Sequence, residues 1–172
     1  MKNSLNIEIT RPYQMLYIMR GISGSGKSTK ARSIVSKERI FSTDDVIQSM
    51  GDYREFFIKM VSSGDFTPLH KAHQINLSNA KKAMIEGGSI VIDNTNLRAN
   101  EPKSYVIAAL EIGFDDNNIK IIDVGTGGLT AEELVERNIH NLSLDAIRKM
   151  IQRHASIGVL TIEKILNSKD MY

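Results

Sequence analysis

The stretch that most constrains the fold of this chain is a glycine-rich segment between an apolar run and a helix-forming run. Residues 21–28 are Gly-Ile-Ser-Gly-Ser-Gly-Lys-Ser, which fits the G-x-x-x-x-G-K-[ST] spacing of the Walker A motif. The apolar run 15–19 predicts a buried strand before the motif, and residues 30–35 predict a helix after it. A strand, a glycine loop and a helix in this order are the context that a phosphate-binding loop (P-loop) requires.

The residue types of this loop suit a triphosphate. Glycines allow consecutive backbone N–H groups to approach phosphate oxygens, and the following helix directs its positive end at the same anion. We expect Lys27 to reach the β- and γ-phosphates and the Ser28 hydroxyl to ligate Mg²⁺. The sequence therefore predicts a nucleoside triphosphate, ATP, with Mg²⁺ as the cofactors. The residues expected to bind the nucleotide are Gly21, Ser23, Gly24, Ser25, Gly26, Lys27, Ser28 and Thr29.

Length and charge set outer bounds on the function. The chain has 172 residues, a formal net charge of +2 and no cysteine. This length predicts one domain, with residues 1–13 as an N-terminal arm and residues 14–172 as a single domain that contains the P-loop. The net charge is too small to indicate a nucleic-acid partner by itself, although it is compatible with a local basic groove. No apolar run is long enough to cross a membrane, so we expect no membrane partner and a cytoplasmic location.

The apolar runs predict the rest of an α/β fold. Further strands are expected at 39–42, 89–92 and 119–124, and the fold predicted is a doubly wound parallel sheet of four to five strands. A helical lid is expected over about 126–156. Residues 51–69 are expected to be irregular. Their aromatic and basic side chains could form a stacking platform for a base, but the helical spacing of Phe56, Phe57 and Met60 favours core packing of these three. The glycines at 125–128 are interpreted as a connection. Helices are expected over 43–50, 68–86, about 100–112, 130–137, 144–156 and 161–166.

Two acidic residues follow the second predicted strand. Asp44 and Asp45 are expected at the same edge of the sheet as the P-loop, because ligands of parallel sheets lie at the carboxyl ends of the strands. Acids in the first turn of a helix also complement the helix dipole, and here Thr43 is expected to cap that helix. Beside a P-loop, however, Asp44 becomes a candidate to deprotonate an acceptor hydroxyl, with Asp45 as a further contact to the acceptor.

The third predicted strand ends in Asp93-Asn94-Thr95-Asn96. An apolar strand that runs into an acid is similar to a Walker B motif, so Asp93 is expected to hold Mg²⁺. Asn94 stands where P-loop ATPases use a glutamate, and the chain has no Asn-Lys-x-Asp guanine signature, which favours a transferase over a motor ATPase or a GTPase. Asn94, Thr95 and Asn96 are candidates to bind a hydroxylic acceptor, and capping of the next helix is a compatible role.

Basic and histidine side chains later in the chain are candidates for functional roles in the site. Arg137 is expected to close over the phosphates from the lid, whereas for Arg148 and Arg153 this role and a solvated helix face are both left open. His70 and His73 share a helix face, but no third ligand stands at a suitable spacing, so we do not expect zinc. His73 and Asn76 are expected to face the acceptor cleft instead.

Taken together, these stretches resemble the kinase domain of phage polynucleotide kinase and the small stand-alone polynucleotide-kinase-like P-loop proteins, and more distantly the zeta-toxin kinases. The resemblance implies transfer of the γ-phosphate of ATP to a hydroxyl, in this family typically the 5′-hydroxyl of DNA or RNA. It places the general base on Asp44 and a lid arginine on Arg137. The stretches that carry the resemblance are 21–29, 42–45, 72–73, 92–97, 137–138 and 147–150.

The chain also departs from the family pattern. Ile47, Thr43 and, approximately, Asn141 stand where the phage enzyme has arginines in or near the acceptor cleft. The chain ends where the phosphatase domain of the phage enzyme would begin, so no 3′-phosphatase activity is expected. The favoured function is therefore a 5′-hydroxyl polynucleotide kinase. The alternatives are a kinase for a nucleotide sugar, a small metabolite or a hydroxymethylated DNA base, and a nucleotide-binding module without catalysis. A basic groove would favour the first, and the residues expected to line it are Arg54, Lys59, Lys71 and Arg98.

Overall fold

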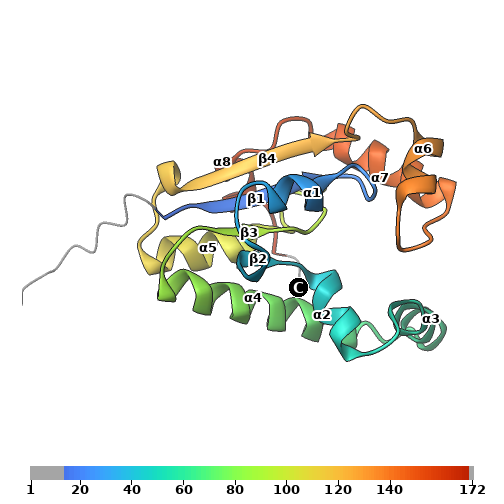
Figure 1. Ribbon diagram of the computed structural model, residues 1–172, viewed down its shortest axis with the longest axis horizontal. Helices are drawn as coiled ribbons and strands as arrows, with labels where there is room; N and C mark the ends of the chain where they lie inside the picture. The colour runs from blue at the N-terminus through green and yellow to red at the C-terminus, as the bar shows by residue number, and fades with distance from the viewer. Residues whose placement is uncertain (1–13, 171–172) are drawn as a thin grey trace, which may run out of the picture.

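A four-stranded sheet organises the computed structural model, which describes residues 14–170 (Figure 1). Its strands lie in the order β2-β3-β1-β4, and every pair of neighbours is parallel. The predicted parallel α/β sheet is therefore confirmed, with four strands. The expected N-terminal arm, residues 1–13, lies outside the described residues. The strands are β1 (Leu16–Gly21), β2 (Ile40–Phe41), β3 (Ile90–Ile92) and β4 (Ile119–Gly125).

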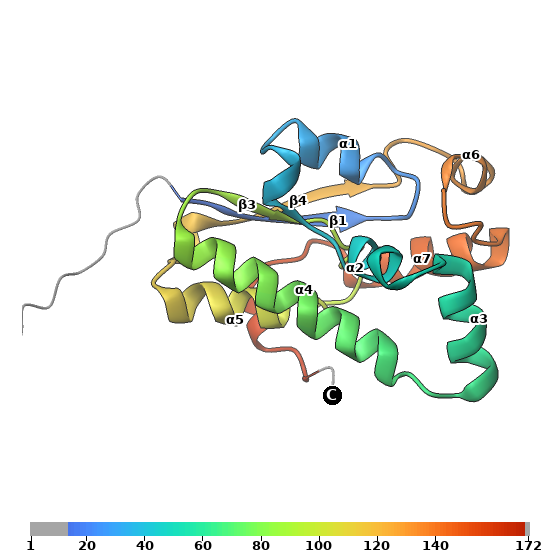
Figure 2. The same cartoon turned by 60° about the horizontal axis from the view of Figure 1, so that its bottom comes forward.

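Helices cover both faces of this sheet. Figure 2 shows α1 on one face and α4 and α5 on the other, while α6 and α7 lie beyond the carboxyl ends of the strands. Short 3₁₀ turns occupy Lys37–Arg39 and Asp116–Asn118. The helices are α1 (Lys27–Arg32), α2 (Thr43–Met50), α3 (Tyr53–Ser63), α4 (Thr67–Glu86), α5 (Lys103–Ile112), α6 (Ala131–Arg137), α7 (Leu144–Ile157) and α8 (Ile162–Leu166).

The strands alternate between two buried cores, as expected for a sheet covered on both faces. Leu16 and Ile18 of β1 point into the core formed with α4, α5 and α8. Met19 of β1 and Val91 of β3 point to the opposite face, against α1. A third cluster joins Ile22 of the P-loop to α6 and α7, and this cluster connects the lid to the nucleotide loop.

The segment 51–69 was expected to be irregular, and this expectation is wrong. It contains α3, whose first turn is capped by Asp52, since the Asp52 carboxylate accepts a hydrogen bond of 2.8 Å from the Glu55 N–H. The Asp-x-x-Glu spacing that starts α3 is a known helix-start signal and was available in the sequence. Met60 is buried, whereas Phe56 and Phe57 are only half-buried, so the expected core packing of these three is correct for Met60 alone.

Two smaller helix expectations also need correction. Helix α1 ends at Arg32 and does not include residues 33–35, over which it was expected to continue. The Ser33 hydroxyl donates to the carbonyl of Lys30 at 2.7 Å at this end of the helix. Thr43 does not cap α2 with its side chain. It is the first helical residue, and its hydroxyl contacts His73 instead.

Within residues 14–170, none of the helices combines the length and the hydropathy of a membrane span.

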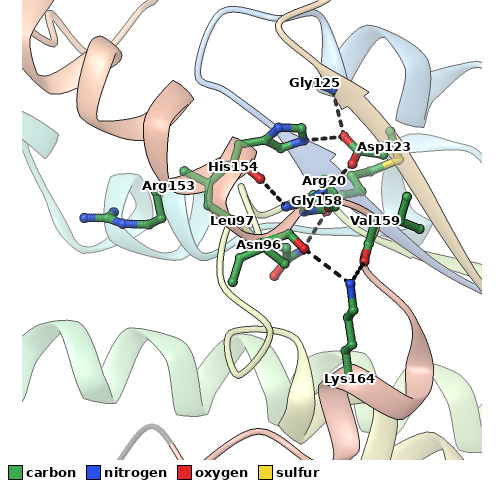
Figure 3. A network of polar contacts seen from close by, with 12 residues as sticks. Arg20, Asn96, Leu97, Asp123, Gly125, Arg153, His154, Gly158, Val159 and Lys164 are labelled. Carbon is green, nitrogen blue, oxygen red and sulfur yellow. Dashed lines mark hydrogen bonds and ion pairs between the residues drawn. The ribbon is translucent and has the colours of Figure 1, made fainter.

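A polar network fixes the far end of α7 to the sheet (Figure 3). Arg20 of β1 is fully buried, and its guanidinium donates to the Asp123 carboxylate of β4 and to the carbonyls of His154 and Gly158. The His154 ring contacts Asp123 at 2.8 Å. The lid helix is therefore anchored to the two strands that lead into the site.

Candidate active site

The P-loop is held by backbone contacts on both sides. The Gly21 N–H donates to the Thr95 carbonyl at 3.0 Å, and the Ile22 N–H donates to the Gly125 carbonyl at 2.9 Å. Gly24 has a φ of +85°, and a Cβ there would lie 2.8 Å from the carbonyl oxygen of Leu134 in α6. The loop is thus fitted between the ends of β3 and β4 and the first lid helix, so its shape depends on all three.

The second glycine loop connects β4 to α6, as expected, and it is also part of the support of the P-loop. A Cβ on Gly127 would lie 2.3 Å from the carbonyl oxygen of Ser25, at a φ of +67°. Such an approach is possible only for glycine. The loop after β4 therefore packs backbone against backbone on the P-loop.

An open cleft of about 410 Å³ lies in front of the P-loop. It contains most of the residues that the sequence singled out for nucleotide, metal and acceptor. The lining residues are Ser23, Gly24, Gly26, Lys27, Ser28, Thr29, Arg32, Lys37, Ile40, Ser42, Asp44, Asp45, Gln48, Asp93, Thr95, Arg137, Ile139 and His140. Of the residues expected to bind nucleotide, Gly21 and Ser25 do not line the cleft, and Ser25 is buried.

Lys27 begins α1 at the bottom of the cleft. Its ammonium donates to the carbonyl of Ile22 at 2.9 Å, so it is held inside the P-loop. Burial lowers the pKa of Lys27, against the opposing charges of Asp93 and Asp44. Because Lys27 interacts with both carboxylates, the three side chains lie within electrostatic reach of one another.

Asp93 and Ser28 form a pair that fits Mg²⁺. Burial raises the pKa of Asp93, and a hydrogen bond from Ser28 and the charge of Lys27 oppose that rise. Among the described residues, no group partners the buried Oδ1 atom of Asp93. A buried carboxylate oxygen without a partner, beside a hydroxyl, suits a hard cation that takes its other ligands from phosphates and water. Within residues 14–170, no cluster of three or more acidic, histidine or cysteine side chains offers an all-protein metal site.

Asp44 is held by two aromatic side chains that sequence reasoning missed. The Tyr53 hydroxyl donates to Oδ1 of Asp44 at 3.0 Å, and Nε2 of His140 lies 3.4 Å from Oδ2. Burial alone would raise the pKa of Asp44, but the contacts with His140 and Tyr53 and the charge of Lys27 outweigh it and hold the pKa below its ordinary value. Asp44 is therefore a carboxylate at neutral pH and can accept a proton.

The backbone of α2 is fixed next to this carboxylate. The Thr43 N–H donates to Oδ1 of Asn94 at 2.9 Å, and the Thr43 hydroxyl lies 3.1 Å from Nδ1 of His73. Asn94 and His73 thus hold the helix that carries Asp44, and neither lines the cleft. Asn76 was also expected to face the acceptor, but it is buried and donates to the Tyr105 hydroxyl at 2.8 Å.

Three further expected acceptor residues lie elsewhere. Asn96 is buried, and its amide donates to the Met19 carbonyl at 2.7 Å, which gives it a structural role. Arg54 and Arg98 are exposed and do not line the cleft. Asp45 and Thr95 do line it, as expected.

The cleft has a different set of cations from the one expected. Arg137 lines it from the end of α6, and Arg32 and Lys37 line it from the end of α1 and the 3₁₀ turn. Arg148, left open between two roles, pairs with Glu132 at 2.9 Å and does not line the cleft. Arg153 points away from the polar network in Figure 3 and is also absent from the lining.

Comparison with known proteins agrees with this geometry. A family model described as AAA domain matches residues 16–157. The chain belongs to this family. NEDD4-binding protein 2 of Homo sapiens is 34% identical over 154 residues, which are 85% of this chain and 8% of that protein. The chain thus spans less than a tenth of that relative.

A solved structure titled "Structure of the Pnkp1/Rnl/Hen1 RNA repair complex" shares the fold. The match has a TM-score of 0.51 and 19% identity, and it covers 95% of this chain and 52% of that chain. The expected relation to polynucleotide-kinase-like P-loop kinases is confirmed, and so is the P-loop kinase type of fold. The chain is a nucleotide-binding P-loop kinase-like domain.

Proposed function

We propose that this chain transfers the γ-phosphate of ATP to the 5′-hydroxyl of a polynucleotide. The observation that carries this proposal is the position of Asp44 in the same cleft as the P-loop, within electrostatic reach of Lys27. A carboxylate opposite a phosphate-binding lysine is the arrangement that phosphoryl transfer to a hydroxyl needs.

Each protein side chain has a defined part in the reaction. The acceptor oxygen forms a bond to the γ-phosphorus while the bond from the γ-phosphorus to the β,γ-bridging oxygen breaks and ADP leaves. The acceptor proton moves to Asp44. Lys27 and Arg137 balance the negative charge on the phosphoryl oxygens. Mg²⁺, held by Ser28 and Asp93, would add positive charge at the phosphates when it is bound.

Two observations support a polyanionic acceptor. Arg32 and Lys37 line the cleft that contains Asp44 and provide the basic wall that Arg54 and Arg98 do not. The fold neighbour belongs to a complex whose title names RNA repair, which favours a nucleic-acid acceptor over a small metabolite.

The test is transfer of labelled γ-phosphate from ATP to a 5′-hydroxyl oligonucleotide, as DNA and as RNA in parallel. The matched control is the same oligonucleotide with a 5′-phosphate, which offers no 5′-hydroxyl acceptor. We expect label on the 5′-hydroxyl strand alone, with Mg²⁺ required. Label on neither strand, while ATP binds tightly, would refute the polynucleotide as acceptor.

A further inference from the structure

Two aromatic rings from distant parts of the chain stack beside Asp44. The centroids of the Tyr53 and His140 rings lie 4.2 Å apart, and the ring planes meet at 28°. Tyr53 begins α3, and His140 lies in the loop between α6 and α7. Figures 1 and 2 both place α3 at the end of the molecule where α6 and α7 lie. The stack therefore joins the lid to α2 and α3, and α2 carries Asp44.

Each oxygen of Asp44 contacts one of the two stacked rings. Tyr53 donates to one oxygen at 3.0 Å, and Nε2 of His140 lies 3.4 Å from the other. A hydroxyl that gives its proton to Asp44 must come within about 2.6–3.2 Å of one of these oxygens. The longer of the two contacts belongs to His140, which lies in a loop outside any helix, so His140 is the ring that an acceptor can replace more easily.

The ring that would remain is held firmly. Phe57 packs against Tyr53 with centroids 4.8 Å apart, and Phe56 packs edge-on against Phe57 at 5.4 Å. Removal of His140 from the stack would leave one face of the Tyr53 ring open toward the cleft. A planar heteroaromatic ring already occupies that place, so the site accepts a flat π-system of the kind that a nucleobase presents.

The distances suit a nucleoside. The hydroxyl of Tyr53 touches Asp44, so any group stacked on the Tyr53 ring lies close to the carboxylate. In a nucleoside, the 5′-hydroxyl is separated from the base by a single ribose. A base on Tyr53 would thus bring its own 5′-hydroxyl toward Asp44.

We propose that Tyr53 is the stacking platform for the base of the nucleotide that carries the accepting 5′-hydroxyl, and that the His140 ring occupies this place until the acceptor displaces it. This inference rests on the proposed function, because it takes Asp44 as the group that receives the acceptor proton. Stacking discriminates little among bases, so the site takes any of them and selects for a nucleoside unit at the 5′ end.

The test compares two acceptor oligonucleotides that differ only in the base of the 5′-terminal nucleotide, one with the base and one abasic. We expect the acceptor KM to rise about 5- to 150-fold for the abasic strand, the range that a single base–aromatic stack provides. Tyr53→Leu removes the difference by raising the KM of the ordinary strand. Tyr53→Phe retains the difference, although it loses the hydrogen bond to Asp44. This pair separates stacking from the positioning of the carboxylate.

His140→Ala tests the second half of the proposal. If the imidazole only occupies the place of the base, this variant keeps the preference for the ordinary strand and does not raise its KM. A rise equal to that of Tyr53→Leu would show that His140 is part of the binding site and overturn this half. Thermal unfolding and the KM for ATP, unchanged in Tyr53→Leu, establish that α3 is intact in that variant.

A second readout does not depend on phosphate transfer. An oligonucleotide with 2-aminopurine at its 5′ end loses fluorescence when that base stacks, so binding to the wild type and Tyr53→Phe quenches it, and binding to Tyr53→Leu does not. Quenching of this kind without any transfer would refute the proposed function and support the base site. Transfer with equal KM values for both strands would overturn the base site and leave the proposed function standing. Absence of both transfer and quenching would overturn the base site as well.

Discussion

The fully buried guanidinium of Arg20 is neutralised by Asp123, which reaches it from the neighbouring strand β4. The same carboxylate contacts His154 near the end of α7, so one acid connects β1, β4 and the lid helix. Arg20 directly precedes the P-loop glycine Gly21. The stability of this network and the shape of the nucleotide loop are therefore coupled.

Replacement of Asp123 should destabilise the fold. Asp123→Asn keeps the size of the side chain but leaves the buried Arg20 charge without an anion, which should lower the free energy of unfolding by about 3 kcal/mol. Urea unfolding measures this, with Asp116→Asn, an exposed acid of the 3₁₀ turn before β4, as the control. A loss below about 0.5 kcal/mol, the size of ordinary surface substitutions, would contradict the assigned role.

The same pair predicts a pH dependence. Although burial opposes it, hydrogen bonds from His154 and Arg20 hold the pKa of Asp123 below its ordinary value of 3.8. A carboxyl with a lowered folded-state pKa stabilises the fold above its unfolded pKa and loses this contribution as pH falls through the folded pKa. The difference in unfolding free energy between wild type and Asp123→Asn should therefore be full above about pH 5 and shrink below about pH 4. A difference that stays constant down to pH 2 would show that Asp123 does not titrate as inferred.

Gly127 and Gly128 offer a matched pair for the support of the P-loop. Both have a positive φ, +67° and +79°, but only a Cβ on Gly127 meets another atom, the Ser25 carbonyl oxygen at 2.3 Å. Gly127→Ala should displace the P-loop and lower kcat/KM for ATP by about 100-fold. Gly128→Ala has the same backbone strain, about 1–2 kcal/mol, without the collision, and should retain activity. Equal activity of the two variants would contradict the packing of this loop on the P-loop.

A substitution of Asn96 distinguishes the structural role seen in the fold from the acceptor-binding role expected from the sequence. Its buried amide holds the Met19 carbonyl at 2.7 Å. Asn96→Ala should therefore lower the free energy of unfolding by about 1–3 kcal/mol and leave the acceptor KM unchanged. If Asn96→Ala leaves the free energy of unfolding unchanged and raises the acceptor KM, Asn96 binds the acceptor and the structural role is wrong.

Local patterns were sufficient to predict the scaffold of the site. The P-loop, Asp44 and Asp93 each follow an apolar run, and parallel strands bring such positions to one edge of the sheet without further information. Helix α3 was missed although Asp52 and Glu55 carried a usable start signal, because the half-exposed aromatics that follow show no clean apolar face.

The rest of the site depends on contacts between distant segments. His140 reaches Asp44 from a loop almost a hundred residues later in the chain. No local sequence pattern around either residue predicts this contact. Arg32 and Lys37 enter the cleft only because α1 ends early and a 3₁₀ turn follows. The sequence also did not predict the burial of Arg20, because a charged residue at the end of an apolar strand is normally exposed.

The most direct test of the account is the effect of Asp44→Asn on turnover and on nucleotide binding in the same preparation. Loss of the proton acceptor should reduce the rate of γ-phosphate transfer by about 100- to 10,000-fold and leave the Kd for ATP nearly unchanged. Lys27→Ala, as the contrasting variant, should lose both. Transfer by Asp44→Asn at a near-wild-type rate would contradict the central claim that this carboxylate receives the acceptor proton.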